Sequence, residues 1–435
     1  MDFAWMAVVL LAALALLLVA GVWIALTLLG VGWIAMLVFT NSPAGPLMAT
    51  TSWGSSTSWA LTALPLFIWM GEILFRTRIS EDMFHGLAPW MAPLPGRLMH
   101  CNVFGCGIFA AISGSSAATA ATIGRITIPE LLKRGYDEKM AIGSLAGAGT
   151  LGLLIPPSII MIVYGVAADV SIARLFVAGV IPGILLMLMF AGYIALWALL
   201  NPHRTPPREA RTTLGQKVYA ARHLIPAVLL IAAVIGSIYT GVATPTEAAA
   251  IGVAGALVLA AVGGSLNGSS FMQSVMGATR TSCMIAFILA GAAFLTVAMG
   301  FTGVPRIMAE WIGAQGFSAV HLIVVLTILY IILGCFIDGI SMVVLTSSVI
   351  LPSVKAANID LLWFGIFIVL VVEMAQITPP VGFNLFVLQG LTGKNMFEVA
   401  KAALPFFFLM VAAVALIWLF PELVTFLPSR MFNLR

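Results

Sequence analysis

Two double prolines have the clearest chemical consequence in this sequence. Pro156-Pro157 lies in the apolar run GTLGLLIPPS, and Pro379-Pro380 lies in EMAQITPPVG. A proline has no N–H group and clashes with the preceding turn, so a helix must unwind at such a pair. Unwinding frees backbone carbonyls, which are good ligands for a hard cation such as Na⁺. We expect freed carbonyls near Gly149, Gly152 and Ile155 in the first run and near Ala375 and Thr378 in the second.

Small hydroxyl residues precede each double proline. They are Ser113, Ser115 and Ser116 in the first case, and Ser341, Thr346, Ser347 and Ser348 in the second. If each group belongs to a hairpin that enters the membrane and returns, its hydroxyls add cation ligands. Helix N-termini that meet at the hairpin tips also attract an anion. The alternative is that Gly, Ser and Ala only allow helices to pack closely.

Two acidic residues, Asp338 and Glu373, stand in apolar surroundings. Ionisable residues inside a membrane are candidates for function by default. Asp338 could order a hairpin tip or ligate a cation, and Glu373 could do the same or carry a proton. Each could instead be a structural hydrogen-bond acceptor. Arg125 could attract an anion to the cytoplasmic mouth, but snorkelling to the membrane interface is the favoured interpretation.

The composition excludes most other classes of protein. Of 435 residues, 62% are hydrophobic and only 8% are charged, whereas soluble domains carry about 25% charged residues. A soluble globular protein, a disordered chain and a nucleic-acid binder are therefore excluded. The enzyme motifs HExxH and GxSxG and the P-loop are absent from the sequence. We expect an all-α polytopic membrane protein that is not an enzyme and whose transport is driven by an ion.

Hydropathy predicts about ten transmembrane helices, since a spanning helix needs about 20 apolar residues. They are expected at about 5–22, 24–40, 57–75, 138–168, 173–200, 224–241, 246–263, 281–300, 361–391 and 399–425. Two further stretches, about 101–132 and 324–357, fit re-entrant hairpins better. The uncharged stretch Asn41 to Ser58 suits an external loop. Ile79 to His100 is predicted to be an interfacial helix, with a counterpart around Val304 to Ile312.

The two halves of the chain repeat each other. Pro129 and Pro156 recur 223 residues later as Pro352 and Pro379, and Asp137 recurs as Asp360. We predict a first repeat over 1–200, a basic cytoplasmic linker over 201–223 and a second repeat over 224–435. An odd number of spans would invert the second repeat. Paired broken helices in inverted repeats are typical of secondary transporters with a site near the midplane.

The motifs together resemble the large membrane subunit, a DctM-like permease, of tripartite ATP-independent periplasmic (TRAP) transporters. The similarity lies in GIFAAISGSSAATAATIG, IPELLKRGYDEKMAIG, AGTLGLLIPPS and LFVAGVIPG between Gly105 and Gly183, in GVATPTEAAA, and in Asp338 to Gly390. It extends through nearly the whole chain. In GVATPTEAAA, Thr244 also has the features of a helix cap, with Pro245 and Glu247 in the first turn.

The resemblance implies an elevator-type, Na⁺-coupled importer of a small organic anion, such as a C4-dicarboxylate or a sugar acid, in the bacterial inner membrane. It also implies a small four-helix membrane subunit and a periplasmic binding protein as partners, within membrane lipid and without nucleic acid. One Na⁺ site would use Ser113, Ser116, Gly152 and Ile155, and the other Gly334, Ala375, Thr378 and Val381. The substrate would lie between the hairpin tips, near Ser115, Asp338, Gly339 and Ser341. The alternatives are an inverted-repeat anion carrier that needs no binding protein and, from a different class, a channel or an intramembrane enzyme.

Overall fold

The computed structural model of the chain describes residues 3–207, 213–304, 306–307, 310, 318–379 and 382–432. Within these ranges the regular structure consists of α-helices and short 3-10 helices. The helices of the first half are α1 (Phe3–Val19), α2 (Ile24–Phe39), α3 (Ala44–Ser56), α4 (Ala63–Phe75), α5 (Ile79–Met91), α6 (His100–Ser113), α7 (Ser116–Lys133), α8 (Glu138–Gly149), α9 (Leu151–Leu154), α10 (Ile159–Ala168) and α11 (Ile172–Leu200).

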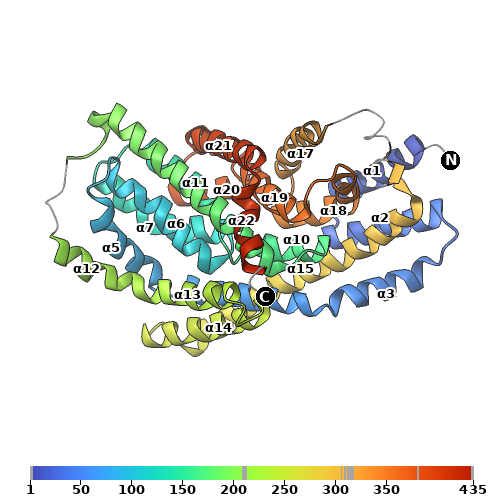
Figure 1. Cartoon of the computed structure of the whole chain (residues 1–435), viewed down its shortest axis with the longest axis horizontal. Helices are drawn as coiled ribbons and strands as arrows, with labels where there is room; N and C mark the ends of the chain where they lie inside the picture. The colour runs from blue at the N-terminus through green and yellow to red at the C-terminus, as the bar shows by residue number, and fades with distance from the viewer. Residues whose placement is uncertain are drawn as a thin grey trace.

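The second half is built in the same way. Its helices are α12 (Leu214–Ala221), α13 (Ile225–Tyr239), α14 (Pro245–Val262), α15 (Gly268–Thr302), α17 (Ala319–Gly334), α18 (Gly339–Ala356), α19 (Leu361–Gln376), α20 (Phe383–Thr392), α21 (Met396–Leu419) and α22 (Glu422–Phe432). Figure 1 shows α19 at the centre, with α6 and α7 on one side of it and α17 and α18 on the other. The long helices α2, α3 and α15 lie together at one end, and α3 and α2 both pack on α15.

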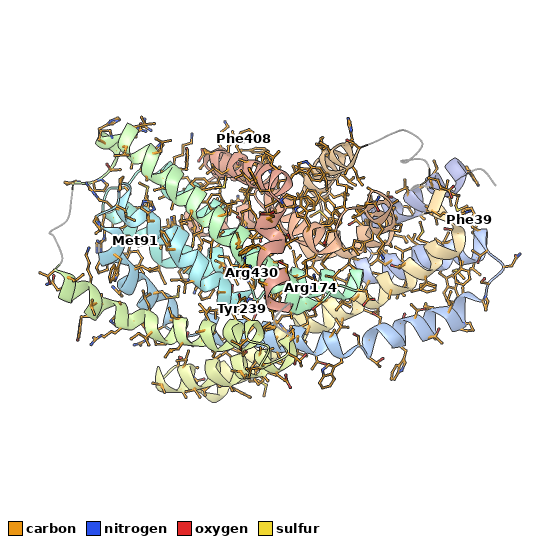
Figure 2. The ribbon with its side chains drawn as sticks, viewed as in Figure 1. Phe39, Met91, Arg174, Tyr239, Phe408 and Arg430 are labelled. Carbon is orange, nitrogen blue, oxygen red and sulfur yellow. The ribbon has the colours of Figure 1, made fainter. Side chains whose placement is uncertain are left out.

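The described residues contain 6 helices that are long and apolar enough to cross a membrane, or up to 8 if each bent pair forms one span. Shorter apolar helices, including α1, α2 and α19, account for other predicted spans. Apolar side chains also cover much of the outer surface. Phe408 of α21 is 60% exposed and lies at the edge of the molecule in Figure 2. Apolar helices with an apolar outer surface are typical of a polytopic membrane protein. The number of about ten spans stays a prediction.

Each predicted hairpin and broken helix corresponds to a pair of helices, and the re-entry of the hairpins into the membrane stays a prediction; among the hairpin helices, only α18 is long and apolar enough to cross one. Hairpin 1 is formed by α6 and α7, and hairpin 2 by α17 and α18. The helix pair made of α8–α9 and α10 is bent by 42°. In the second half, α19 ends at Gln376 and α20 begins at Phe383, on either side of the second double proline. Pro380 and Val381 lie outside the described residues.

Equivalent helices begin at equivalent caps. Asp137 and Asp360 cap α8 and α19, with the Asp137 carboxylate 2.8 Å from the Met140 N–H nitrogen. The bounds of α7 and α18 are 116–133 and 339–356, again 223 residues apart. These bounds agree with the repeat, while its inversion across the membrane stays a prediction. Thr244 starts α14 with a capping box, as its sequence predicts.

Several predicted boundaries are wrong. The expected external loop Asn41 to Ser58 largely forms α3, because it is uncharged enough to pack along α15. The span expected at 281–300 begins earlier, since Asn267 and Ser270 form a capping box that starts α15 ahead of its apolar part. Arg280 therefore lies inside α15.

Other segments differ in smaller ways. The linker contains the helix α12, and residues 208–212 of it lie outside the described residues. The span expected at 399–425 is divided at Pro421 into α21 and α22. Helix α5 forms where the interfacial helix is expected. Its expected counterpart around Val304 to Ile312 lies partly outside the described residues.

Candidate ion and substrate site

The tip of hairpin 1 lies directly on the first broken helix. A Cβ added at Gly152 would stand 2.5 Å from the Cα of Ser116, closer than real Cβ atoms approach. Only glycine allows this contact. The tip turns at Gly114, which has a φ of 61° and accepts a hydrogen bond from the Ile159 N–H at 3.4 Å. Ser116 and Gly152, predicted to share a cation site, are therefore adjacent.

The other residues predicted for the first cation site have mixed environments. Ser113 bonds Thr119 inside the hairpin, with the two hydroxyl oxygens 2.8 Å apart. Ile155 is extended between α9 and the double proline. Ser115 caps α7 by accepting from the Ala118 N–H at 3.4 Å. The Ser115 side chain therefore stabilises the conformation of the tip.

Glu373 of α19 is the polar centre of this region. Its side chain is completely buried. The Oε1 atom accepts hydrogen bonds from the Ser116 hydroxyl and from the Leu153 N–H, the latter at 3.1 Å. The Oε2 atom is buried with no hydrogen-bond partner among the described residues. The sequence marked Glu373 as a candidate, but gave no signal that it would bond hairpin 1 from the other half of the chain.

Hairpin 2 lies on the second broken helix in the same way. A Cβ at Gly334 would stand 2.1 Å from the Cβ of Ala375. The Thr378 hydroxyl donates to the Met374 carbonyl at 2.8 Å, which leaves its lone pairs free. Gly334 and Ala375 are thus brought together as predicted. Val381 falls outside the described residues.

Asp338 is the N-cap of α18 and matches Ser115 at the repeat offset. Its Oδ2 accepts from the N–H groups of Ile340 and Ser341, each at 3.1 Å, and its Oδ1 also accepts from the Ser341 hydroxyl. Both carboxylate oxygens accept hydrogen bonds from the hairpin itself, so Asp338 stabilises the start of α18 at the tip. A Cβ at Gly339 would meet Val372 of α19 at 2.4 Å, which explains the glycine.

The hydroxyl residues beyond the second tip are engaged within the hairpin. Thr346 bonds the buried Tyr330, with the two oxygens 2.6 Å apart. The Ser347 and Ser348 hydroxyls donate to carbonyls of their own helix. The sequence grouped these residues with the tip. In the structure their hydroxyls make hydrogen bonds within hairpin 2 instead.

The first turn of α10 lies between the two tips. Ile159 bonds Gly114 of hairpin 1, and the side chain of Ile160 would stand 3.1 Å from a Cβ at Gly339 of hairpin 2. Ser158 caps this helix through the Met161 N–H. The N-terminal ends of α7, α10 and α18 therefore gather near the two tips, where their dipoles favour negative charge.

A cavity of about 1110 Å³ borders the tip of hairpin 2. Asp338, Ser341 and Phe336 line it from the hairpin, and Arg280 and Phe287 line it from α15. Arg280 is exposed and makes no ion pair or hydrogen bond with any described residue. No signal in the sequence indicated that Arg280 would line a cavity.

Arg125 and Lys394 lie away from the tips. The Arg125 guanidinium is exposed and stands 5.8 Å from the centre of the Phe75 ring, in keeping with an interfacial position. Lys394 pairs with Glu138 at 2.9 Å, which joins the start of α8 to the loop after α20. The hydrogen bond from Lys394 to Glu138 raises the pKa of Lys394 above its ordinary value.

Within the described residues, apolar helices with two hairpins packed on broken helices define a polytopic membrane protein. Residues 11–423 match the family described as the tripartite ATP-independent periplasmic transporter, DctM component. The chain belongs to this family. It is 31% identical to the C4-dicarboxylate TRAP transporter large permease protein DctM of Pseudomonas aeruginosa, over 92% of both chains.

Other relatives have names that mention different substrates. The isethionate TRAP transporter permease protein DctMQ of Oleidesulfovibrio alaskensis is 31% identical over 95% of this chain and 65% of its own length. The ectoine TRAP transporter large permease protein TeaC of Halomonas elongata is 29% identical over 86% of this chain and 87% of its own. The solved Alcanivorax borkumensis YdaH transporter has a similar fold, with a TM-score of 0.64 at 13% identity over 93% of this chain and 97% of its own.

The capping geometry of Asp338 can be tested by substitution. Asp338→Ser installs the residue type that caps hairpin 1 and should retain most of the free energy of unfolding. Asp338→Ala removes the cap and should lower that free energy by about 1 kcal/mol. Denaturant unfolding in detergent measures both changes. Equal losses in the two variants would show that the charge of Asp338, rather than its capping bonds, stabilises hairpin 2.

Proposed function

We propose that this chain is the large permease of a Na⁺-coupled TRAP transporter that imports a small organic anion across the bacterial inner membrane. One observation carries the proposal: each hairpin rests through a glycine on a helix broken by a double proline. Gly152 makes this contact in the first half and Gly334 in the second. Such discontinuous helices provide both unbonded carbonyls and helix N-termini at one place.

The proposed Na⁺ sites are the two places where a hairpin packs on a broken helix. We call these contacts the Na⁺ seats: one lies at Ser116 and Gly152, and the other at Gly334 and Ala375. In the first, Pro156 and Pro157 have no N–H to donate to the carbonyls of Gly152 and Leu153, which stand four residues before them. Ser116 adds a hydroxyl beside Gly152. In the second, Thr378 adds a hydroxyl whose lone pairs are free, near Ala375 and Gly334. Hard oxygen ligands of this kind suit Na⁺.

The proposed substrate site is the cavity beside hairpin 2, which no residue of hairpin 1 lines, so it differs from the predicted position between the two tips. Arg280 is the cation that faces this cavity, and the N-terminal end of α18 adds a positive dipole. The printed names of the relatives include a C4-dicarboxylate and isethionate, which are both small anions. A carboxylate or sulfonate group would pair with the Arg280 guanidinium. The apolar side chains of Phe287 and Phe336 would enclose the rest of the ligand.

The proposed partners follow from the family. TRAP large permeases work with a small membrane subunit and a binding protein, and the isethionate relative is named as a DctMQ permease. We propose that the hairpins and broken helices move together past a scaffold that includes α2, α3 and α15. The competing proposal is an ion-coupled carrier of the same fold that needs no binding protein.

Uptake into proteoliposomes tests the function directly. The chain, its small subunit and its binding protein are reconstituted, and uptake of succinate, isethionate and ectoine is compared in NaCl and KCl. We expect uptake of one of these solutes only with an inward Na⁺ gradient and only with the binding protein. Uptake without the binding protein would favour the stand-alone carrier. Equal uptake in NaCl and KCl would exclude Na⁺ coupling.

Thr378→Ala tests the second Na⁺ seat. Because a ligand that binds only the folded state raises the melting temperature, the wild type should melt higher in NaCl than in KCl or choline chloride. The variant should lose part of this Na⁺-specific rise, since a ligand oxygen is removed. Thr392→Ala is a matched control, because Thr392 also donates to a carbonyl four residues earlier, at 2.7 Å. Loss of the rise in both variants would argue against a specific site at Thr378.

Arg280→Gln tests the substrate site. Removal of the guanidinium charge should raise the KM for anion uptake at least tenfold, about the 1.4 kcal/mol that a tenfold change represents. The Na⁺-specific rise in melting temperature should stay unchanged, because Arg280 is in neither Na⁺ seat. Arg174→Gln, at the start of α11, is the control for a general loss of positive charge. An unchanged KM in the Arg280 variant would remove this residue from the site.

A further inference from the structure

The second carboxylate oxygen of Glu373 is an unusual atom in this molecule. Glu373 is completely buried, and its Oε2 has no hydrogen-bond partner among the described residues. Its Oε1, by contrast, accepts from both Ser116 and Leu153. The carboxyl group is therefore held firmly by one oxygen, while the other oxygen is available for a ligand.

A buried carboxylate is costly unless its charge is compensated. An unpaired ion in the interior loses its hydration without a replacement. Among the described residues, the groups that donate hydrogen bonds to Glu373 are a serine hydroxyl and a backbone N–H, and neither carries a formal positive charge. A bound cation would provide the missing compensation at Oε2.

The Ser116 hydroxyl is the oxygen placed directly beside the Glu373 carboxylate. The Ser116 hydroxyl donates its proton to Oε1, so its lone pairs face other directions. Leu153 donates its N–H to the same Oε1, and its carbonyl lacks a donor at Pro157. The Gly152 carbonyl lacks one at Pro156 for the same reason. Hairpin 1 thus brings the Ser116 hydroxyl to the carboxylate, and the unpaired carbonyls of Gly152 and Leu153 belong to the same turn of the broken helix.

We propose that Glu373 supplies the anionic ligand of the Na⁺ site at hairpin 1, so that this site is built by both halves of the chain. The inference rests on the proposed Na⁺ coupling and extends it. In this proposal Glu373 of α19, in the second half, binds the same ion as Ser116 and the first broken helix. Occupancy of the site by Na⁺ would hold the tip of hairpin 1 against α19.

The repeat makes the two Na⁺ seats chemically different. The residue 223 positions before Glu373 is Thr150, whose hydroxyl donates to the Gly147 carbonyl at 2.6 Å. The first half therefore provides no acid at the position equivalent to Glu373. The seat at hairpin 1 carries a formal negative charge and should bind Na⁺ more tightly than the seat at hairpin 2.

Glu373→Gln tests the inference with little change of shape. The amide oxygen of glutamine can still accept from Ser116 and Leu153, but the negative charge is lost. The chain is purified with its small subunit, and its melting temperature is titrated with NaCl against KCl at constant ionic strength. We expect the half-saturating Na⁺ concentration to increase at least tenfold. Glu398→Gln, which removes an exposed acid of α21, should leave it at the wild-type value.

The outcomes separate this inference from the proposed function. A wild-type protein with no Na⁺-specific rise overturns Na⁺ coupling and this site together. A Glu373→Gln variant that keeps the wild-type Na⁺ midpoint overturns the inference alone. If that variant also melts at a higher temperature than the wild type in both NaCl and KCl, the carboxyl group of Glu373 is assigned a proton instead of a cation. If this variant does not fold, Ser116→Ala replaces it. That variant should weaken the Na⁺ midpoint severalfold, and an unchanged midpoint would also overturn the inference.

Discussion

Broken backbone hydrogen bonding in an apolar environment is the constraint on which the rest of this structure depends. Each double proline removes N–H donors from a helix that has little water around it. Irregular backbone at such a depth is tolerated only where it is buried in protein or lines a wet cavity. Hairpin 1 therefore covers the break after α9, and hairpin 2 lies against α19 just before the second break. The same uncovered carbonyls that make the breaks costly make them useful to a cation.

Close contact between hairpin and broken helix requires glycine at the point of approach. Gly152 and Gly334 leave no space for a side chain, and a methyl group at either position would separate the two elements. Close packing also fixes the distances between oxygen atoms, which decide whether an ion can be bound. The small residues of the hairpins therefore serve packing and binding at once, and the two explanations left open by the sequence are compatible.

The two halves have similar helices but different side chains at equivalent positions. Ser115 and Asp338 occupy the same capping position, and one is neutral while the other is charged. Thr150 and Glu373 also correspond, and the second is the buried acid that bonds hairpin 1. Repetition gives both halves the same helices, and single substitutions at equivalent positions then give each half a separate role. Membership of the TRAP large-permease family fits this division between a common frame and varied substrates.

The sequence by itself determined the local features: the double prolines, the hairpin helices, the cap at Thr244 and the 223-residue offset. These depend on hydropathy and on hydrogen bonds between near neighbours, which a sequence displays directly. It did not determine that Asn41 to Ser58 is largely helical or that Arg280 faces a cavity from within α15. Only the tertiary structure placed Glu373 against Ser116, which stands 257 residues earlier. Such a contact depends on how two distant helices pack, and no local pattern encodes the pairing.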